Sequence, residues 1–191
     1  MRMRDLRKAL LAVTIIASSS GPSQAQRPYG IGHAATSAQL KSWDIDIAPD
    51  GRNLPAGSAT IAQGRAVYAA QCASCHGAQG QGGLGDRLAG GQGTLATAAP
   101  VKTVGSFWPY ATTLFDYVRR AMPLNAPQSL ADADVYAVSG YVLFLNGLLP
   151  EDAVVDKKTL VDLKMPNRKG FVGDPRPDVN DPACQRDCGK P

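Results

Sequence analysis

The segment Cys72-Ala73-Ser74-Cys75-His76 decides how this chain is interpreted. Two cysteines separated by two residues and followed directly by a histidine form a c-type haem attachment site. Each thiol can form a thioether with one vinyl group of the porphyrin, and the adjacent imidazole then binds the iron as its proximal ligand. We therefore expect one covalent haem c, attached through Cys72 and Cys75, with His76 on the iron.

Residues 1–25 have the features of a secretory signal peptide. A basic start precedes a short apolar run from Ala9 to Ala17, and Ser23-Gln24-Ala25 offers the small residues of a cleavage site. The alternative is an amphipathic N-terminal helix of the mature protein. The run is too short to span a bilayer, and no later segment is apolar enough to do so. We expect an exported, periplasmic protein without a membrane span, beginning near Gln26.

The charge balance argues against nucleic acid or anionic lipid as a partner. The full chain has 191 residues, 20 of them Lys or Arg and 16 Asp or Glu. Residues 1–25 hold four basic residues and Asp5, so the mature chain keeps 16 basic and 15 acidic residues. A nearly neutral protein has no strong electrostatic attraction for polyanions.

Strongly periodic sequence is confined to one region, which predicts a single small all-α domain over residues 60–147. Helices are expected over 60–75, 112–121 and 131–145. The last would be capped by Ser129 with Asp132 and closed by Asn146-Gly147. Gly64 and Gly140 are candidates for close approach where the first and last helices cross. The flanking residues 26–59 and 148–191 are rich in Gly, Pro, Asp and Asn, and are predicted to be irregular arms.

The sixth position on the iron has three candidate ligands. Met122 comes directly before Pro123, between the last two predicted helices, and a thioether there favours electron transfer by raising the reduction potential. Met165 could reach the iron if the C-terminal arm folds back. His33 lies in a Gly-rich segment and is expected at the surface. We favour Met122, against the alternative that it is a core residue.

The region from Gly64 through Gly147 resembles a class I cytochrome c domain. Four further stretches resemble the cytochrome subunit of molybdenum sulfite and sulfur dehydrogenases: Trp43-Asp44-Ile45-Asp46, the run from Val104 to Pro123, Ala126-Pro127-Gln128-Ser129-Leu130, and Met165-Pro166-Asn167-Arg168. The resemblance covers nearly the whole mature chain. Two features depart from it: this chain has a single CxxCH motif, and Leu88-Ala89-Gly90-Gly91 stands where many relatives have a proline that helps to orient the proximal imidazole.

This resemblance implies a fold in which the N- and C-terminal helices cross around the haem, with Cys72, Cys75, His76 and Met122 in their usual roles. It implies an electron-transfer subunit rather than an enzyme. Electrons would come from a molybdenum dehydrogenase and pass to a downstream carrier. The alternative is a haem enzyme or gas-binding protein with an open sixth position. That function needs distal acid–base groups, and the sequence offers no His or Glu near the expected distal segment.

Other polar and aromatic residues have two interpretations each. The N–H of Trp108 and the O–H of Tyr110 could donate to haem propionates, or the rings could be plain core aromatics. Arg119 and Arg120 could pair with propionates or be solvated. The arms, over residues 27–57 and 150–180, are expected to dock on the partner enzyme.

Cys184 and Cys188 form a CxxxC pair without a following histidine. They cannot complete a second haem site of this kind, because the proximal ligand is missing. In an oxidising compartment two neighbouring cysteines favour a local disulfide, which is the expectation here.

Overall fold

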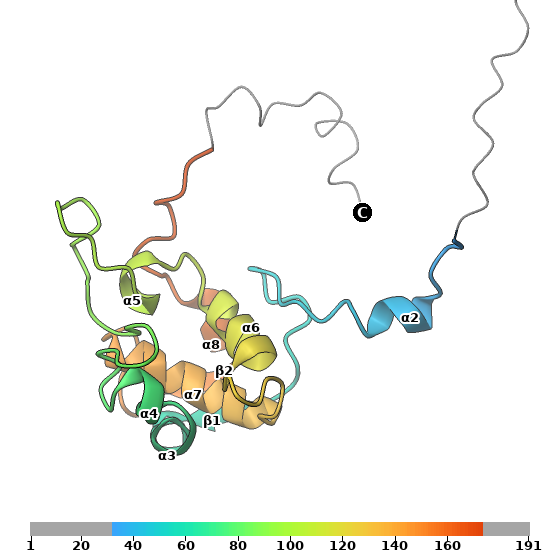
Figure 1. Cartoon of the computed structure of the whole chain (residues 1–191), viewed down its shortest axis with the longest axis horizontal. Coiled ribbons are helices and arrows are strands. Elements are labelled where there is room, and N and C mark those ends of the chain that lie inside the picture. Colours follow the sequence, from blue (N-terminus) through green and yellow to red (C-terminus); the bar gives the residue numbers. More distant parts are fainter. Residues whose placement is uncertain (1–31, 174–191) are drawn as a thin grey trace, which may run out of the picture. The chain divides into compact units, whose positions relative to one another are not determined.

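The computed structural model describes residues 32–173. The chain divides into two compact units, Met1–Asp44 and Ile45–Pro191, and Figure 1 labels the elements of both. They are α2 (Ser37–Lys41), β1 (Ser58–Thr60), α3 (Ile61–Gln71), α4 (Ala73–His76), α5 (Val104–Phe107), α6 (Ala111–Ala121), α7 (Asp132–Leu145), β2 (Val154–Asp156) and α8 (Lys157–Asp162). The predicted signal peptide, with Cys184 and Cys188, lies outside the described residues.

The first unit contributes one short helix to the described part of the chain. Helix α2 begins with a capping box, in which Thr36 accepts the backbone N–H of Gln39 and the Gln39 side chain accepts the N–H of Thr36. Both satisfied donors would otherwise be unpaired at the helix start. None of its residues is buried, and Leu40 and Trp43 are 55% and 85% exposed.

The predicted helix over 60–75 is divided in two. Thr60 caps α3 by accepting the N–H of Gln63, and the helix ends at Gln71. Cys72 follows with φ −122° and ψ −36°, outside the range of a regular helix. The chain therefore turns at Cys72, and the haem motif continues on the short helix α4.

The last predicted helix is α7, which begins one residue later than expected. Its N-cap residue is Ala131, which makes no side-chain cap bond, so the predicted Ser129 cap is wrong. Asp132 and Asp134 lie in the first turn instead, where carboxylates interact favourably with the positive end of the helix dipole. The helix ends as predicted, at Asn146, and Gly147 follows with φ +67°.

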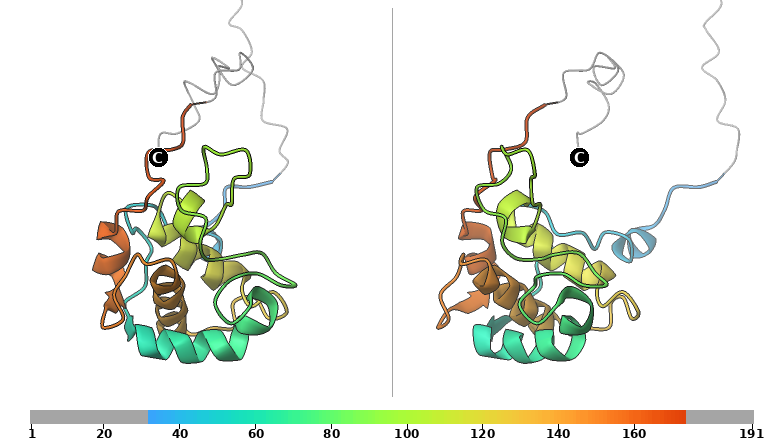
Figure 2. Two further views of the ribbon diagram at one scale, coloured as in Figure 1. Left: turned by 90° about the vertical axis from the view of Figure 1, so that its left-hand side faces the viewer. Right: turned by 60° about the vertical axis from the view of Figure 1, so that its left-hand side comes forward.

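Helices α3 and α7 cross, as Figure 2 shows, and they are in direct contact. A Cβ atom on Gly64 would lie 2.0 Å from the backbone oxygen of Ala137, so only glycine permits this approach. Next to it, the rings of Tyr68 and Tyr141 pack with centroids 5.2 Å apart. Gly140 also lies at a close approach, but a Cβ there would meet Val155 of β2 at 2.5 Å.

Residues on both sides of the predicted domain contribute to its fold. Strands β1 and β2 pair antiparallel, with Ser58 opposite Asp156 and Thr60 opposite Val154. The expected irregular arms thus contain a small sheet and α8, because their apolar residues pack on the helices. Those buried residues outside 60–147 are Ile47, Leu54, Ala59, Val155, Leu160 and Met165. The second unit is therefore mostly helical with one two-stranded sheet.

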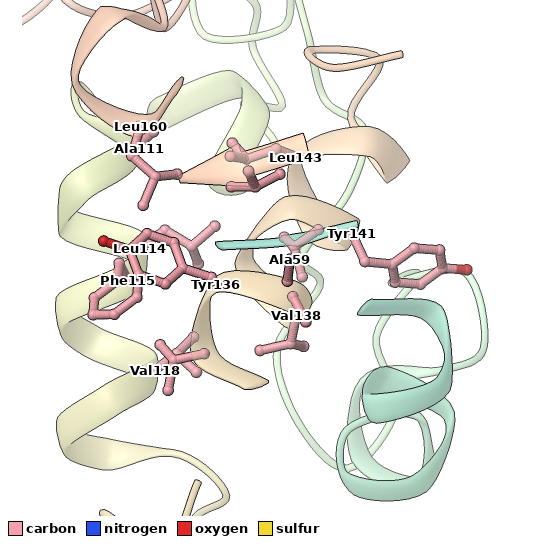
Figure 3. Close-up of a cluster of buried hydrophobic side chains, with 14 of the residues drawn as sticks. Ala59, Ala111, Leu114, Phe115, Val118, Tyr136, Val138, Tyr141, Leu143 and Leu160 are labelled. Carbon is pink, nitrogen blue, oxygen red and sulfur yellow. The ribbon is translucent and has the colours of Figure 1, made fainter. Parts of the chain in front are cut away.

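The core lies between α6 and α7, as seen in Figure 3. Phe115 of α6 and Tyr136 of α7 have ring centroids 4.5 Å apart and are fully buried. The Tyr136 hydroxyl donates to the backbone oxygen of Pro55 at 2.8 Å, which fixes the segment before β1 against α7. In the described part of the chain, none of the helices has the length and apolar character needed to cross a bilayer.

Candidate haem-binding site

The CxxCH segment is fixed by backbone bonds of its own turn. The N–H groups of Cys75 and His76 donate to the oxygen of Cys72 at 3.2 and 3.0 Å. The Tyr68 hydroxyl donates to the oxygen of Gly77 at 2.8 Å, and Tyr68 is only 1% exposed. The end of α3 is thus tied to the residue that follows the histidine. This holds both ends of α4 in place.

The two cysteines differ in exposure but are both free thiols. Cys72 is half-buried against the hydrophobic core, and Cys75 is exposed. Burial raises the pKa of the Cys72 thiol to about 11, and the nearby Cys75 adds to this. At neutral pH Cys72 therefore carries its S–H proton, and its thiol would be one of the two that hold a covalent haem.

His76 has one ring nitrogen engaged and the other available. Its Nδ1 lies 2.7 Å from the backbone oxygen of Asp86. A neutral imidazole that donates from Nδ1 keeps its lone pair on Nε2, which is the arrangement found in most metal-bound histidines. The sequence did not reveal this acceptor, because a backbone oxygen has no residue-type signature.

The Gly-rich loop after the motif packs closely against the imidazole. The N–H of Gly85 donates to the oxygen of Cys75 at 2.8 Å, and that of Gly82 to the oxygen of His76 at 2.8 Å. A Cβ atom on Gly85 would lie 2.8 Å from Cε1 of the His76 ring and 2.9 Å from Nδ1. A glycine is therefore required here so that the loop can bring the Asp86 oxygen to the ring.

Asn146 connects this region to the end of α7 and was missed as a site residue. Its Nδ2 donates to the oxygens of Leu88 and Val142 at 3.0 and 2.9 Å, and its Oδ1 accepts the N–H of Gly90 at 3.1 Å. The residue is 7% exposed. The sequence indicated only that Asn146 ends a helix. Its hydrogen bonds to Leu88 and Gly90 join residues that are far apart along the chain, so the sequence could not reveal them.

Trp108 and Tyr110 lie on one turn between α5 and α6, and both are half-buried. The Trp108 ring packs edge-on against Tyr117, with centroids 5.8 Å apart. Among residues 32–173, neither the Trp108 N–H nor the Tyr110 O–H has a hydrogen-bond partner. The buried Tyr68 and Tyr136, in contrast, both donate to backbone oxygens. Both donor atoms are accessible from outside the protein, so the acceptor groups of a bound molecule could reach them.

The three candidates for the sixth position have different surroundings. Met122 is half-buried at the end of α6, packed against the core, with its N–H donating to Val118. Met165 is 3% exposed and belongs to the buried hydrophobic cluster. His33 is exposed in the first unit.

The two arginines before Met122 are both paired with carboxylates. Arg119 Nε lies 3.0 Å from Asp132 Oδ1, and the Arg120 guanidinium forms an ion pair with Asp116. Asp116 is 7% exposed and also accepts the N–H of Ile47 at 2.9 Å. The predicted alternative, pairing with haem propionates, has these carboxylates as competitors.

The residues present fit a covalent haem. The thiols of Cys72 and Cys75 are free, His76 can offer Nε2, and two unpaired donors lie at Trp108 and Tyr110. When bound, haem supplies a one-electron couple between ferric and ferrous iron.

Comparisons with known proteins identify the family of this chain. The family model described as cytochrome c oxidase, cbb3-type, subunit III, matches residues 59–142. Sulfane dehydrogenase SoxCD from Paracoccus pantotrophus has a similar structure, with a TM-score of 0.72 and 39% sequence identity over 82% of this chain and 77% of that chain. The chain belongs to the cytochrome c family. The resemblance seen in the sequence is thereby confirmed at the level of the family.

A curated relative of this cytochrome covers a shorter stretch. Thiosulfate dehydrogenase from Stutzerimonas stutzeri (strain A1501) is 34% identical in an alignment of 115 residues that covers 52% of this chain and 35% of that protein. The matched part thus spans about a third of the relative's length. Both similar proteins carry the names of sulfur-compound dehydrogenases.

Proposed function

We propose that this protein is an exported monohaem cytochrome c that transfers single electrons in the periplasm. The haem would be attached to Cys72 and Cys75, with His76 and Met122 as axial ligands and Trp108 beside a propionate. The observation that carries the proposal is the His76 side chain, whose Nδ1 is held 2.7 Å from the Asp86 oxygen. This contact favours the tautomer and ring orientation that a proximal ligand needs.

The surroundings of Met122 support electron transfer over the alternative function. A haem enzyme or gas-binding protein needs an accessible sixth position with acid–base groups beside it. The nearest buried acid on α6, Asp116, already accepts from Arg120 and Ile47. Met165 is enclosed in the core, which favours Met122 as the thioether ligand.

The axial ligand can be tested by near-infrared absorption of the oxidised protein. A methionine sulfur on ferric haem gives a charge-transfer band, so Met122→Leu should remove it. Met165→Leu, the matched control with the same change of side chain, should keep it. Leucine is used because it conserves core volume. Loss of the band in Met165→Leu alone, or rapid CO binding by the reduced wild-type protein, would contradict the proposal.

We further propose that the electron donor is a molybdenum sulfite or sulfur dehydrogenase, and that a second carrier accepts the electron. The names of the two similar proteins support a place in sulfur-compound oxidation. The first unit is the candidate docking segment, since α2 buries none of its own residues and Trp43 is 85% exposed. Residues 45–57 are less suited to this role because Ile47 and Leu54 are buried in the second unit.

The docking segment can be tested by deletion. A protein that keeps its signal peptide but lacks residues 27–44 should retain its haem spectrum and lose co-purification with the donor from the native host. Trp43→Ala should weaken the complex, with exposed Ser42→Ala as the control in the same segment. A complex unchanged by the deletion would refute this part of the proposal.

The name thiosulfate dehydrogenase also suggests a catalytic alternative, in which the cytochrome itself oxidises a sulfur anion. A simple experiment distinguishes an electron-transfer protein from an enzyme that oxidises the anion itself. Purified oxidised protein mixed with thiosulfate or sulfite should stay oxidised until the donor enzyme is added. Rapid reduction by either anion alone would favour the enzyme.

A further inference from the structure

The C-terminal segment 165–171 packs over the turn that carries Trp108 and Tyr110. Asn167 Nδ2 donates to the backbone oxygen of Phe107 at 2.6 Å. The ring of Phe171 packs edge-on against the ring of Phe107, with centroids 5.2 Å apart. Met165, at the start of the segment, is buried in the core. Two contacts with Phe107, at the end of α5, and the burial of Met165 in the core therefore hold this segment in place.

Arg168 lies within this segment, and its guanidinium is placed over the ring of Tyr110. Its Cζ is 5.0 Å from the ring centroid, within the range of a cation–π contact. The side chain is half-buried. Within residues 32–173 no carboxylate pairs with it, whereas Arg119 and Arg120 are matched by Asp132 and Asp116.

The same turn thus carries two unpaired donors and an uncompensated positive charge. The donors are the Trp108 N–H and the Tyr110 O–H, and the charge is that of Arg168. An anionic group close to Tyr110 could pair with this guanidinium and accept from both donors in charge-assisted hydrogen bonds. A covalently bound haem brings two carboxylates, its propionates, into the protein.

We propose that Arg168 is the cation that faces the haem propionates, held there by the segment 165–171. This inference rests on the proposed haem site and adds a residue that determines its reduction potential. A positive charge near the haem favours the ferrous state, because the reduced iron carries one positive charge less. Arg168 is in this sense a positioning and tuning residue rather than a ligand.

The test is a redox titration of the full-length holo-cytochrome with charge-removing variants. At a fixed ambient potential, Arg168→Gln should lower the ratio of reduced to oxidised haem on the order of tenfold, which is about 59 mV for a one-electron couple. Arg168→Met, which keeps an unbranched stem, should lower it as well. Arg168→Lys should stay closer to the wild type because the charge is kept. A urea titration of each variant checks that the fold is intact.

Lys169→Gln is the matched control, since it removes one charge from the next residue, which is exposed. The ratio of reduced to oxidised haem in Lys169→Gln should stay within about twofold of the wild-type ratio. Equal shifts in Arg168→Gln and Lys169→Gln would show a general charge effect and overturn the proposal. A wild-type ratio of reduced to oxidised haem in Arg168→Gln would also overturn the proposal. Lys102 is a second nearby cation, with its ammonium 5.1 Å from the Phe107 ring. A large shift in Lys102→Gln together with no shift in Arg168→Gln would overturn it as well.

The outcome is distinguishable from a failure of the proposed function. If the wild-type protein lacked a c-type absorption spectrum, or Met122→Leu kept the near-infrared band, the haem site itself would be wrong. If those results hold and the Arg168 variants titrate like the wild type, only the inference about Arg168 fails.

Discussion

Single atoms decide the geometry around His76. The Asp86 oxygen lies 2.7 Å from Nδ1, and this is possible because Gly85 has no Cβ to push the loop away from the ring. These two contacts, with the Asp86 oxygen and with Gly85, determine where the ring nitrogens of His76 lie. The proximal side of the site therefore depends on a residue that carries no functional group.

Gly85→Ala should disturb the proximal histidine without straining the backbone. The added Cβ would lie 2.8 Å from the imidazole, and Gly85 does not have a positive φ. We expect a loss of roughly 1–3 kcal/mol in the free energy of unfolding from overpacking, together with a shifted reduction potential. Urea titration and potentiometry measure the two effects.

Gly173→Ala is the control for this substitution, because no atom lies within 4 Å of a Cβ built there. It should leave both stability and potential unchanged. An unchanged potential in Gly85→Ala would mean that the imidazole does not depend on this contact.

Asn146→Ala should destabilise the protein although the residue is far from the CxxCH motif in sequence. It would leave the N–H of Gly90 without its partner, and the oxygen of Leu88 would keep only the N–H of Val104. A buried unpaired polar group costs roughly 1–3 kcal/mol. Thermal unfolding measures the loss, with the exposed Asn125→Ala as the control. Equal melting temperatures for the two variants would contradict the role given to Asn146.

At the scale of elements, the helix pattern was predictable and the contacts between elements were less so. Apolar spacing gave the positions of α6 and α7 to within one residue, because each buries a continuous face. The break at Cys72 and the pairing of β1 with β2 were not predicted. Both depend on tertiary contacts: three-residue strands have too little periodicity to be recognised, and they form because Ala59 and Val155 are buried together.

The residues of the candidate site divide in the same way. Some form a motif of neighbouring residues, and others come together only in the folded chain. Cys72, Cys75 and His76 form a local motif, and their proposed role in haem binding is predicted from the sequence alone. The Asp86 oxygen and the Asn146 side chain are brought to this region by folding, and nothing in their immediate neighbours indicates it.

The crossing of α3 and α7 can be tested with Gly64→Ala. Alanine favours a helix over glycine by about 1 kcal/mol, so an isolated helix would gain stability. Here the Cβ would lie 2.0 Å from the Ala137 oxygen, which forces the helices apart. We expect a net loss of about 2–3 kcal/mol in urea titrations.

The reverse change, Ala66→Gly on the exposed face of α3, serves as the control. It should cost only about 1 kcal/mol, the difference in helix propensity. A stabilised Gly64→Ala variant would show that the two helices can separate freely.

On the scale of the whole molecule, the boundary between the two units predicts which truncations are tolerated. A mature chain that begins at Ile45 should keep the stability of the full protein. One that begins at Ser58 loses the buried Ile47 and Leu54, and with them roughly 3–6 kcal/mol of apolar burial. It also leaves Asp116 without the Ile47 N–H. Melting temperatures of the two truncated proteins, each made with the signal peptide, test this; equal values would contradict the boundary.

The pairing of β1 with β2 has a consequence for how such a module can be used in larger proteins. Ser58 lies opposite Asp156, so the segment from β1 to β2, which holds α3 to α7, begins and ends at neighbouring points. A unit with adjacent entry and exit can be inserted into a surface loop of another protein, or circularly permuted, without reaching across the fold. The two strands thus join the ends of the segment that holds α3 to α7, and the buried residues before β1 and after β2 complete its core.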